Sequence, residues 1–264
     1  MFYKIRIIYY LVIVLMLFFC YQIHADTTTE ECYDEAIEES WECDEWSQTN
    51  TSVVVTAHGG DPCTVYINYS YKKCIETRLG CPPIIHYFVK VNYFDRDWEE
   101  CTDLTEWLIP GYENEEWGEV DEAHLLVTWK EIQNKLANLR YEIFWNTLNE
   151  QEKFDYLCAG ADPNCSINLN TCKNFSVHFT SSNCKAFCYW FEIGPSSIKL
   201  RVKPTDCASE GCCKTTFYYC TCLAMPEPYV YSEEINEGSY GYCTGNPPSC
   251  EEGQFVTDCI AICP

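Results

Sequence analysis

The cysteines constrain the fold of this chain more than any other feature of its sequence. Of the 21 cysteines, Cys20 lies in an apolar segment near the start, and the other 20 are spread over the remaining residues. An even and dense set of cysteines behind a leader is typical of a disulfide framework made in an oxidising compartment. The sequence therefore predicts about ten disulfides and leaves their pairing open. The cysteines expected to be bonded are Cys32, Cys43, Cys63, Cys74, Cys81, Cys101, Cys158, Cys165, Cys172, Cys184, Cys188, Cys207, Cys212, Cys213, Cys220, Cys222, Cys243, Cys250, Cys259 and Cys263.

Residues 1–25 are organised like a secretory signal peptide. Lys4 and Arg6 give a basic start, the run from Ile7 to Cys20 carries no charge, and Ala25 offers a small residue for cleavage. The apolar run is too short and too close to the start to favour a membrane span, although an uncleaved N-terminal anchor is the alternative. We expect a protein that is secreted or exposed at the cell surface, with no membrane span after cleavage.

The net charge of −23 excludes some classes of partner. Nucleic acids and anionic membrane surfaces both attract basic protein surface, so neither is an expected partner. The acidic stretches could attract Ca²⁺, but none has the D-x-D-x-D-G spacing of a calcium loop. We therefore expect a solvated acidic surface and no cofactor.

The cysteines also argue against a metal centre. Cys184 and Cys188 have a separation that metal ligands can have, but zinc requires thiolates, and an oxidising compartment converts these to disulfides. We expect the neighbouring Cys212 and Cys213 to bond to separate partners, because a bridge between adjacent residues is strained.

Composition and periodicity divide the chain into six segments. Together they predict a β-rich α+β fold, rich in disulfides, in which two small antiparallel β-sheet units flank a helical insert. In chain order the segments are a signal peptide (1–25), an acidic N-terminal arm (26–50), a first β unit with an acidic loop (51–118), a helical insert (119–160), a second β unit (161–222) and a Cys- and Pro-rich C-terminal tail (223–264).

The first β unit is predicted to be a three-stranded antiparallel meander, because its runs alternate between apolar and polar residues. From Cys63 to Cys74, Asn68 and Ser70 fall on the face opposite the apolar residues. The third strand, from Ile84 to Phe94, has one apolar face. That face is expected to contain Ile85, Tyr87, Val89, Val91 and Tyr93.

Two further patterns place residues on faces. In the helical insert, apolar residues recur at spacings of four, three, four and three, which is typical of a helix that packs on a core. These residues are Leu125, Trp129, Ile132, Leu136 and Leu139. In the second β unit, one face of a predicted strand carries a basic stripe in an otherwise acidic chain. The stripe consists of Lys199, Arg201 and Lys203.

The runs from Cys63 to Cys74 and from Cys212 to Cys220 both enclose aromatic residues between cysteines, with the sequence Ile-Ile-His-Tyr-Phe-Val-Lys-Val between the two runs. This pattern resembles uncharacterised cysteine-rich secreted proteins of bacterial envelopes, which pair aromatic β-strands with cysteines at the strand ends. The resemblance covers about half of the chain. It implies an extracytoplasmic location and no established activity, so it identifies no functional residue.

The acidic loop that follows the first β unit contains the candidate ligand-binding residues. Its tryptophans follow no regular period, so we expect them to be available for contact with a glycan or a protein. The neighbouring carboxylates could complete a sugar or cation site. The candidates are Trp98, Trp107, Trp117, Asp95, Asp97 and Glu99.

No catalytic residue is assigned. The sequence contains no G-x-S-x-G, H-E-x-x-H or C-x-x-C motif. The histidines beyond the signal peptide are each expected to be surface or structural residues. They are His58, His86, His124 and His178.

The sequence thus favours a secreted or surface-exposed, non-enzymatic structural or adhesive protein. Its partner would be an extracellular protein, a glycan or a second copy of the chain. The first alternative is an extracellular module that binds a glycan or a divalent cation through the acidic loop. The second is a secreted hydrolase that uses a pair of carboxylates.

Overall fold

The computed structural model describes residues 28–77, 83–97, 101–111, 119–158, 175–194, 198–207, 211–222, 229–238, 243 and 246–262. Several sequence predictions fall outside these ranges. They concern the signal peptide, Trp98, Glu99, Trp117, Cys81, Cys165, Cys172 and Cys263.

Most of the described residues belong to strands and to one long helix. In chain order the elements are α2 (Thr29–Ala36), β1 (Glu42–Cys43), β2 (Ser47–Val55), β3 (Cys63–Glu76), β4 (Ile84–Asp97), α3 (Thr102–Leu108), α4 (Glu122–Thr147), α5 (Glu150–Cys158), β5 (Phe175–Ser182), β6 (Cys184–Ile193), β7 (Ile198–Asp206), β8 (Cys212–Cys222), β9 (Tyr229–Gly238), β10 (Phe255–Val256) and β11 (Ile260–Ala261). The expected helical insert is present as α4 and α5, whereas the acidic loop, expected to be irregular, contains helix α3.

β4 lies at the centre of a sheet that divides into two branches. One edge of β4 pairs antiparallel with β3. The other edge pairs in parallel with β5 at residues 85–88 and antiparallel with β7 at residues 94–97. β8 and β9 continue the β5 branch, while β6, β10 and β11 continue the β7 branch. The strands therefore form one mixed sheet and not two separate antiparallel units, because β4 pairs with strands of both predicted units.

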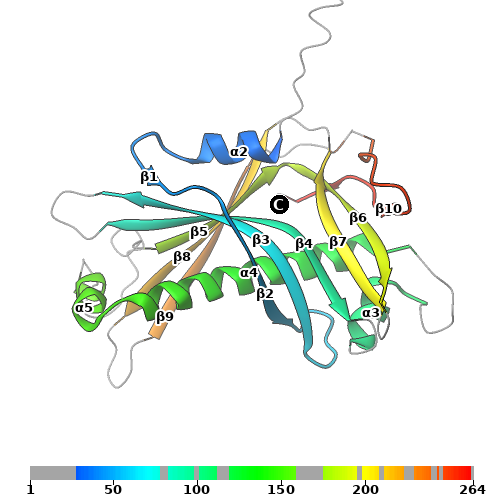
Figure 1. The fold of residues 1–264 in the computed structure, drawn as a ribbon, viewed down its shortest axis with the longest axis horizontal. Helices are drawn as coiled ribbons and strands as arrows, with labels where there is room; N and C mark the ends of the chain where they lie inside the picture. The colour runs from blue at the N-terminus through cyan, green and yellow to red at the C-terminus, as the bar shows by residue number, and fades with distance from the viewer. Residues whose placement is uncertain are drawn as a thin grey trace, which may run out of the picture.

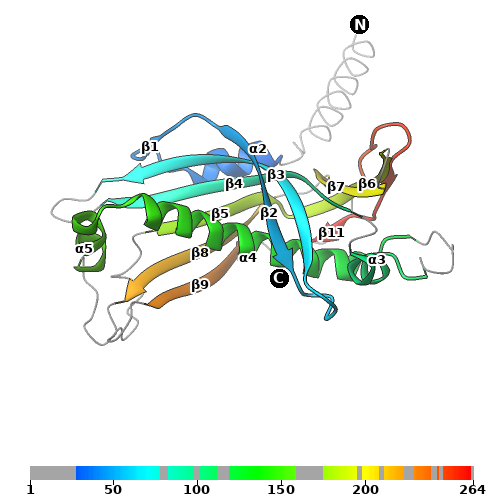
Figure 2. The same ribbon diagram turned by 60° about the horizontal axis from the view of Figure 1, so that its bottom comes forward.

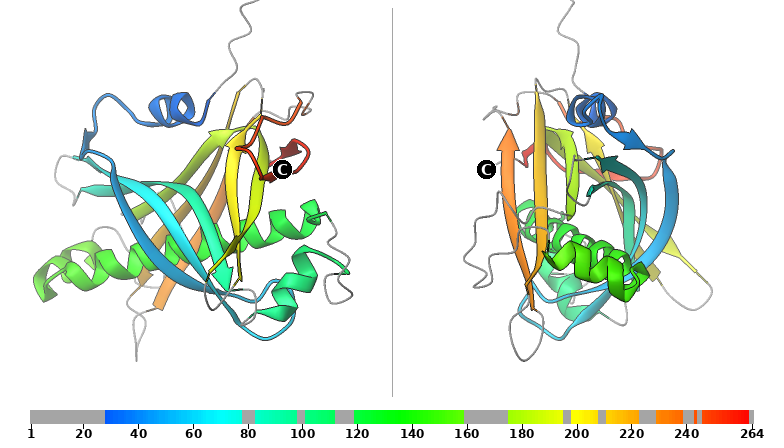
Figure 3. Two further views of the ribbon diagram at one scale, coloured as in Figure 1. Left: turned by 45° about the vertical axis from the view of Figure 1, so that its right-hand side comes forward. Right: turned by 90° about the vertical axis from the view of Figure 1, so that its left-hand side faces the viewer.

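α4 packs along one face of this sheet, which curves around it (Figure 3). We call this the inner face and the opposite one the outer face; α2 lies on the outer side (Figures 1 and 2). The side chain of Asp121 caps α4 by accepting a hydrogen bond from the backbone N–H of His124. Four residues of the predicted stripe of α4 are buried against the strands, namely Leu125, Trp129, Ile132 and Leu136. The prediction for Leu139 was wrong: it is only half-buried, because the buried side of the helix continues through Ala137 and Tyr141. The main hydrophobic core therefore lies between α4 and the inner face.

A β-bulge changes which residues of β4 reach this core. The pairing of β3 with β4 shifts register between Asn68 and Tyr69. Beyond the shift, Phe94 enters the core beside Trp129. Tyr93, which simple alternation placed on the apolar face, instead lies beside Arg201, with 5.1 Å between its ring centroid and the guanidinium carbon. The prediction for Tyr93 was wrong, because a bulge inserts one residue and reverses the faces that follow.

Disulfides join the N-terminal arm and the C-terminal segment to the sheet. Cys32 bonds to Cys212, so Cys212 and its neighbour Cys213, which is also disulfide-bonded, have separate partners as expected. The described bridges are Cys32–Cys212, Cys43–Cys74, Cys63–Cys101, Cys184–Cys243, Cys188–Cys250 and Cys207–Cys259. In the part of the chain that the structure describes, no helix is both long and apolar enough to cross a membrane.

Candidate functional site

A groove of about 550 Å³ lies on the outer face, across β2, β3, β4 and β7. We call it the outer-face groove. Its position follows from alternation, because most of the residues that line it occupy the positions between those that face the core; Ile67 of the core also contributes to the lining. The side chains that matter for its chemistry are Asn50, Tyr66, Asn68, Tyr93, Asp95 and Lys199.

Asp95 places a carboxylate in this groove. It lies on β4, opposite Tyr66 of β3 and Arg201 of β7. The residue is 6% exposed, its Oδ2 lies 3.5 Å from Arg201 Nε, and its Oδ1 has no hydrogen-bond partner among the described residues. Burial raises the pKa of Asp95 above its ordinary value, although Lys199 and Arg201 act to lower it. The groove therefore holds a carboxylate whose hydrogen-bonding capacity is only partly used.

Two tyrosines flank this carboxylate. The side chain of Tyr66 is one of the more exposed large apolar groups, at 45% exposure. Lys199 Nζ lies 5.8 Å from the centroid of its ring. Tyr93 lies beside Arg201, whose Nη2 is 2.8 Å from Oε2 of Glu192. Two members of the basic stripe predicted for β7, Lys199 and Arg201, thus lie at the groove, where Asp95 in its lining and Glu192 beside it balance their charge. Lys203, the third member, lies apart from the groove and pairs with Glu251.

A ladder of side-chain amides continues from the groove across β2, β3 and β4. Asn68 is buried, and its Oδ1 accepts hydrogen bonds from Gln48 Nε2 and Asn92 Nδ2, each at 2.8 Å. The Nδ2 of Asn68 donates to Asn50 Oδ1 at 2.7 Å. Because each amide is held by its neighbours, this wall of the groove presents its polar groups in fixed positions.

The predicted ligand-binding residues are only partly brought together. Asp95 lies in the outer-face groove, and Asp97 ends the same strand, although its side chain lies outside the described parts. Trp107 lies on α3, where its ring stacks on His124 with 3.6 Å between centroids and packs against the main core. The sequence reasoning missed Tyr66, Tyr93 and Lys199 as groove residues. Alternation in β3 could have identified Tyr66, because it places this residue on the face of the sheet away from Val65 and Ile67.

A second polar cluster, which the sequence did not predict, crosses the outer face beneath the N-terminal arm. His86 Nδ1 lies 2.7 Å from Ser176 Oγ and 3.1 Å from His178 Nε2. His86 Nε2 lies 3.2 Å from Glu76 Oε2, and His178 Nδ1 lies 3.0 Å from Thr216 Oγ1. We call these five residues the histidine row.

The histidine row has the members of a Ser-His-acid site but not the access. Ser176 is fully buried, and Trp41 of the arm stacks on His86 with 3.9 Å between centroids. A nucleophile must reach a substrate, so this arrangement favours a structural role. Burial lowers the pKa of His178 well below its ordinary value, with further lowering by His86 and Lys214. Both observations fit the expectation of structural histidines.

Comparisons of this chain with protein-family models, with curated proteins and with solved structures returned no match. Among the described residues, no group of three or more His, Cys, Asp or Glu side chains is arranged to hold a metal ion. The function is therefore argued from the chemistry of the residues alone.

Proposed function

We propose that this chain is a secreted or surface-exposed, non-enzymatic adhesive protein that binds a glycan in the outer-face groove. The described disulfides and the signal-like segment at residues 1–25 support an extracellular location.

The unpartnered Oδ1 of Asp95 is the observation that carries the glycan assignment. A sugar presents hydroxyls that donate to a carboxylate, together with C–H surfaces that pack on aromatic rings. Asp95 supplies the acceptor, and the exposed ring of Tyr66 supplies the platform. The amides of the neighbouring ladder both donate and accept, which is what vicinal hydroxyls require.

The surroundings of Asp95 favour a neutral sugar over a divalent cation. Lys199 and Arg201 both act electrostatically on its carboxyl, so an additional cation would be repelled. Ca²⁺ prefers six to eight oxygen ligands, and the groove contributes the single carboxylate of Asp95 among its described lining residues. We therefore retain the glycan alternative, move it from the acidic loop to the outer-face groove, and set the cation aside.

The proposal is tested by a glycan array with the purified, disulfide-bonded chain and three variants. Asp95→Asn removes the charged acceptor with little change in shape, and we expect about a tenfold or greater loss of affinity for the best glycan. Tyr66→Ala should weaken binding through loss of the platform. Phe255→Ala, at another exposed aromatic residue on β10, is the matched control and should bind like the wild type.

Equal glycan binding by wild type, Asp95→Asn and Tyr66→Ala would overturn the assignment of the groove. An array without hits would overturn the proposal that the ligand is a glycan. The non-enzymatic part is tested separately with polysaccharide and peptide substrates. Turnover of either class that is lost on substitution of a described carboxylate would favour the hydrolase alternative.

A further inference from the structure

A second cleft lies where the two branches of the sheet separate from β4. Residues 89–93 of β4 pair with neither β5 nor β7 in the described sheet. The resulting opening has a volume of about 330 Å³, within the range of small-molecule sites. Its walls come from α2, β4, β5, β6 and β7 and its floor from α4. We call it the fork cleft; it shares no lining residue with the outer-face groove.

Tyr33 of α2 binds to β4 at one end of the fork. Its hydroxyl donates a hydrogen bond to the backbone carbonyl of Val89 on β4. Burial raises the pKa of Tyr33, so the phenol stays protonated and keeps its proton to donate. This hydrogen bond holds α2 against β4 at this end of the fork.

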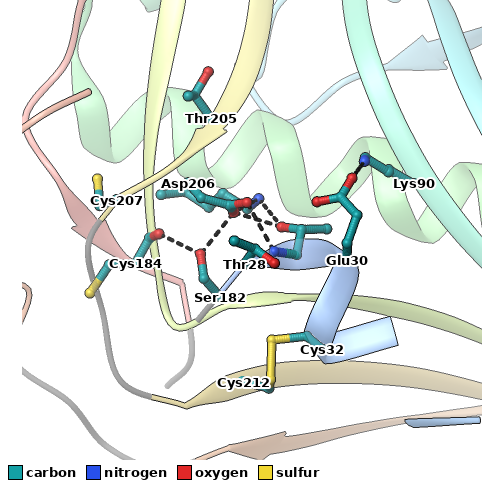
Figure 4. Close-up of polar contacts among 12 residues, drawn as sticks. Thr28, Glu30, Cys32, Lys90, Ser182, Cys184, Thr205, Asp206, Cys207 and Cys212 are labelled. Atoms are coloured by element: carbon teal, nitrogen blue, oxygen red, sulfur yellow. Dashed lines mark hydrogen bonds and ion pairs between the residues drawn. A yellow bond between two sulfur atoms is a disulfide. The ribbon is translucent and has the colours of Figure 1, made fainter. Parts of the chain in front are cut away.

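A buried ion pair fixes one wall of the fork cleft. Lys185 Nζ donates to the carboxylate of Asp206 and, at 2.6 Å, to Thr29 Oγ1. Asp206 also accepts hydrogen bonds from the backbone N–H of Thr29 at 2.9 Å and from Ser182 Oγ at 2.8 Å (Figure 4). Although burial alone would raise the pKa of Asp206, Lys185 and Thr29 lower it to about 2. Four elements thus hold the Lys185 ammonium in a defined position.

The fork cleft contains hydrogen-bonding capacity that its own residues do not use. An ammonium has three N–H donors, and the described structure provides two acceptors for Lys185, from Asp206 and Thr29. Thr180 is 3% exposed, and its Oγ1 has no hydrogen-bond partner among the described residues. A buried hydroxyl without a partner is costly, and it lies in the wall of an open cleft. Both groups can therefore bind an acceptor that enters from outside.

The charged residues in the lining of the cleft and the aromatic residues at its floor restrict the class of ligand that fits it. The lining contains three lysines and one carboxylate; two of the lysines also pair with carboxylates outside the lining, Lys90 with Glu30 and Lys203 with Glu251, and Lys185 is the buried one. The lysines are Lys90, Lys185 and Lys203. Trp129 of α4 and Phe179 of β5 supply aromatic surface in the same lining. A ligand that matches both features has an anionic end and an apolar body.

We propose that the fork cleft binds a small organic acid, with its carboxylate on Lys185 and Thr180 and its apolar body against Trp129 and Phe179. The two unused donors match the two oxygens of a carboxylate. A phosphate presents more oxygens and more charge than these donors can satisfy, and it has no apolar part for the aromatic floor.

The proposal is tested with hexanoate as the probe on the purified, disulfide-bonded chain. Thermal unfolding and isothermal titration calorimetry are run with hexanoate, hexanamide, 1-hexanol and inorganic phosphate. Hexanoate should raise the Tm with a saturable dependence on concentration. The amide and the alcohol, which lack the charge, and phosphate, which lacks the body, should have little effect.

Thr180→Val is the decisive variant because it removes only the unpartnered hydroxyl. We expect it to fold, and to bind hexanoate about tenfold more weakly. Thr128→Val on α4 is the matched control, since Thr128 Oγ1 is also buried without a partner but does not line the cleft. Asp95→Asn, in the outer-face groove, should also keep the wild-type affinity for hexanoate.

Four outcomes would overturn the proposal. If hexanoate has no saturable effect on the Tm or in the calorimetry of the wild type, the fork cleft is not a site for this class of ligand. Equal affinity of the wild type and Thr180→Val for hexanoate would show that the Thr180 hydroxyl does not bind the carboxylate. If 1-hexanol binds as tightly as hexanoate, the charge of Lys185 does not contribute to binding. Saturable binding of phosphate in place of hexanoate would make the ligand an inorganic anion.

Discussion

The inner and outer faces of the sheet bury side chains in different ways. The inner face meets a single long helix, α4, and the main hydrophobic core lies between them, with Thr128 and Arg140 of α4 as buried polar groups. The outer face is covered only in part, by α2 and the arm, and several of its buried groups are polar. Examples are the histidine row, the amide ladder, Asp95 and Lys185. Buried polar groups must satisfy one another, and two that do not, Asp95 Oδ1 and Thr180 Oγ1, belong to residues that line the candidate binding sites.

The comparison predicts that the largest single losses of stability come from the inner face. Phe175 is enclosed by the rings of Tyr141, Phe144 and Tyr219. Phe175→Ala should lower the free energy of unfolding by about 3–5 kcal/mol, because it leaves a cavity among aromatic groups. Urea unfolding gives this value. The control, Phe255→Ala at an exposed ring, should cost less than about 1 kcal/mol; similar losses in both variants would contradict the difference between the faces.

The next largest effect is expected at the buried ion pair on the outer side. Lys185→Met leaves the carboxylate of Asp206 without its cation and should cost about 3 kcal/mol in urea unfolding. The side chain of Asp206 is 27% exposed, so water reduces the loss. Lys153→Met, which breaks the surface pair with Glu150, should cost less than about 1 kcal/mol. A Lys185→Met protein as stable as Lys153→Met would show that the pair adds nothing to the attachment of α2.

The histidine row should make stability fall in mild acid. The pKa of His178 in the folded chain lies below 6.5, so below that pH the unfolded chain binds a proton that the folded chain does not. The contribution of His178 to the free energy of unfolding should therefore be fully present above pH 6.5. Below that pH the free energy of unfolding should decrease, by at most about 1.4 kcal/mol per pH unit from this residue. The neighbours of His178 are His86, Ser176, Thr216 and the cation Lys214.

Urea unfolding at about pH 7.5 and about pH 5 measures this dependence. His178→Gln should reduce it, whereas the control His58→Gln, in a turn outside the row, should leave it as in the wild type. A pH dependence that is unchanged in His178→Gln would assign it to other groups.

The smallest effect is expected in the amide ladder. Asn92→Ala removes one donor to Asn68 and should cost about 1 kcal/mol, because Gln48 still donates to the same oxygen. On the inner side, Asn138→Ala removes the acceptor of the Tyr219 hydroxyl and serves as a comparison of similar size. A loss in Asn92→Ala as large as that in Phe175→Ala would mean that the ladder, and not the core, holds β2 to β4.

Alternation and helical periodicity predicted most of the inner face, since burial of apolar residues follows directly from their spacing. They failed at Tyr93, where a bulge reverses the faces, and at the union of the two β units, which depends on pairing between residues far apart in sequence. They also placed Asp95 with the tryptophans of the acidic loop, whereas Asp95 lies with Tyr66 and Lys199 and Trp107 packs on His124. The pattern of residues within a strand does not determine which strands pair with β4, because β5 and β7 are far from it in sequence.

The sequence by itself determined the disulfide framework, the helical stripe of α4 and the alternation of the strands, because each of these depends on residue type and local spacing. Only the tertiary structure decided the disulfide partners, the fork at β4 and the two sites that depend on it. The physical reason is that β4 offers one edge to two strands of opposite direction, and that edge cannot be filled along its whole length. The opening that remains, and the groove on the outer face beside it, arise from this pairing and not from any single segment of the chain.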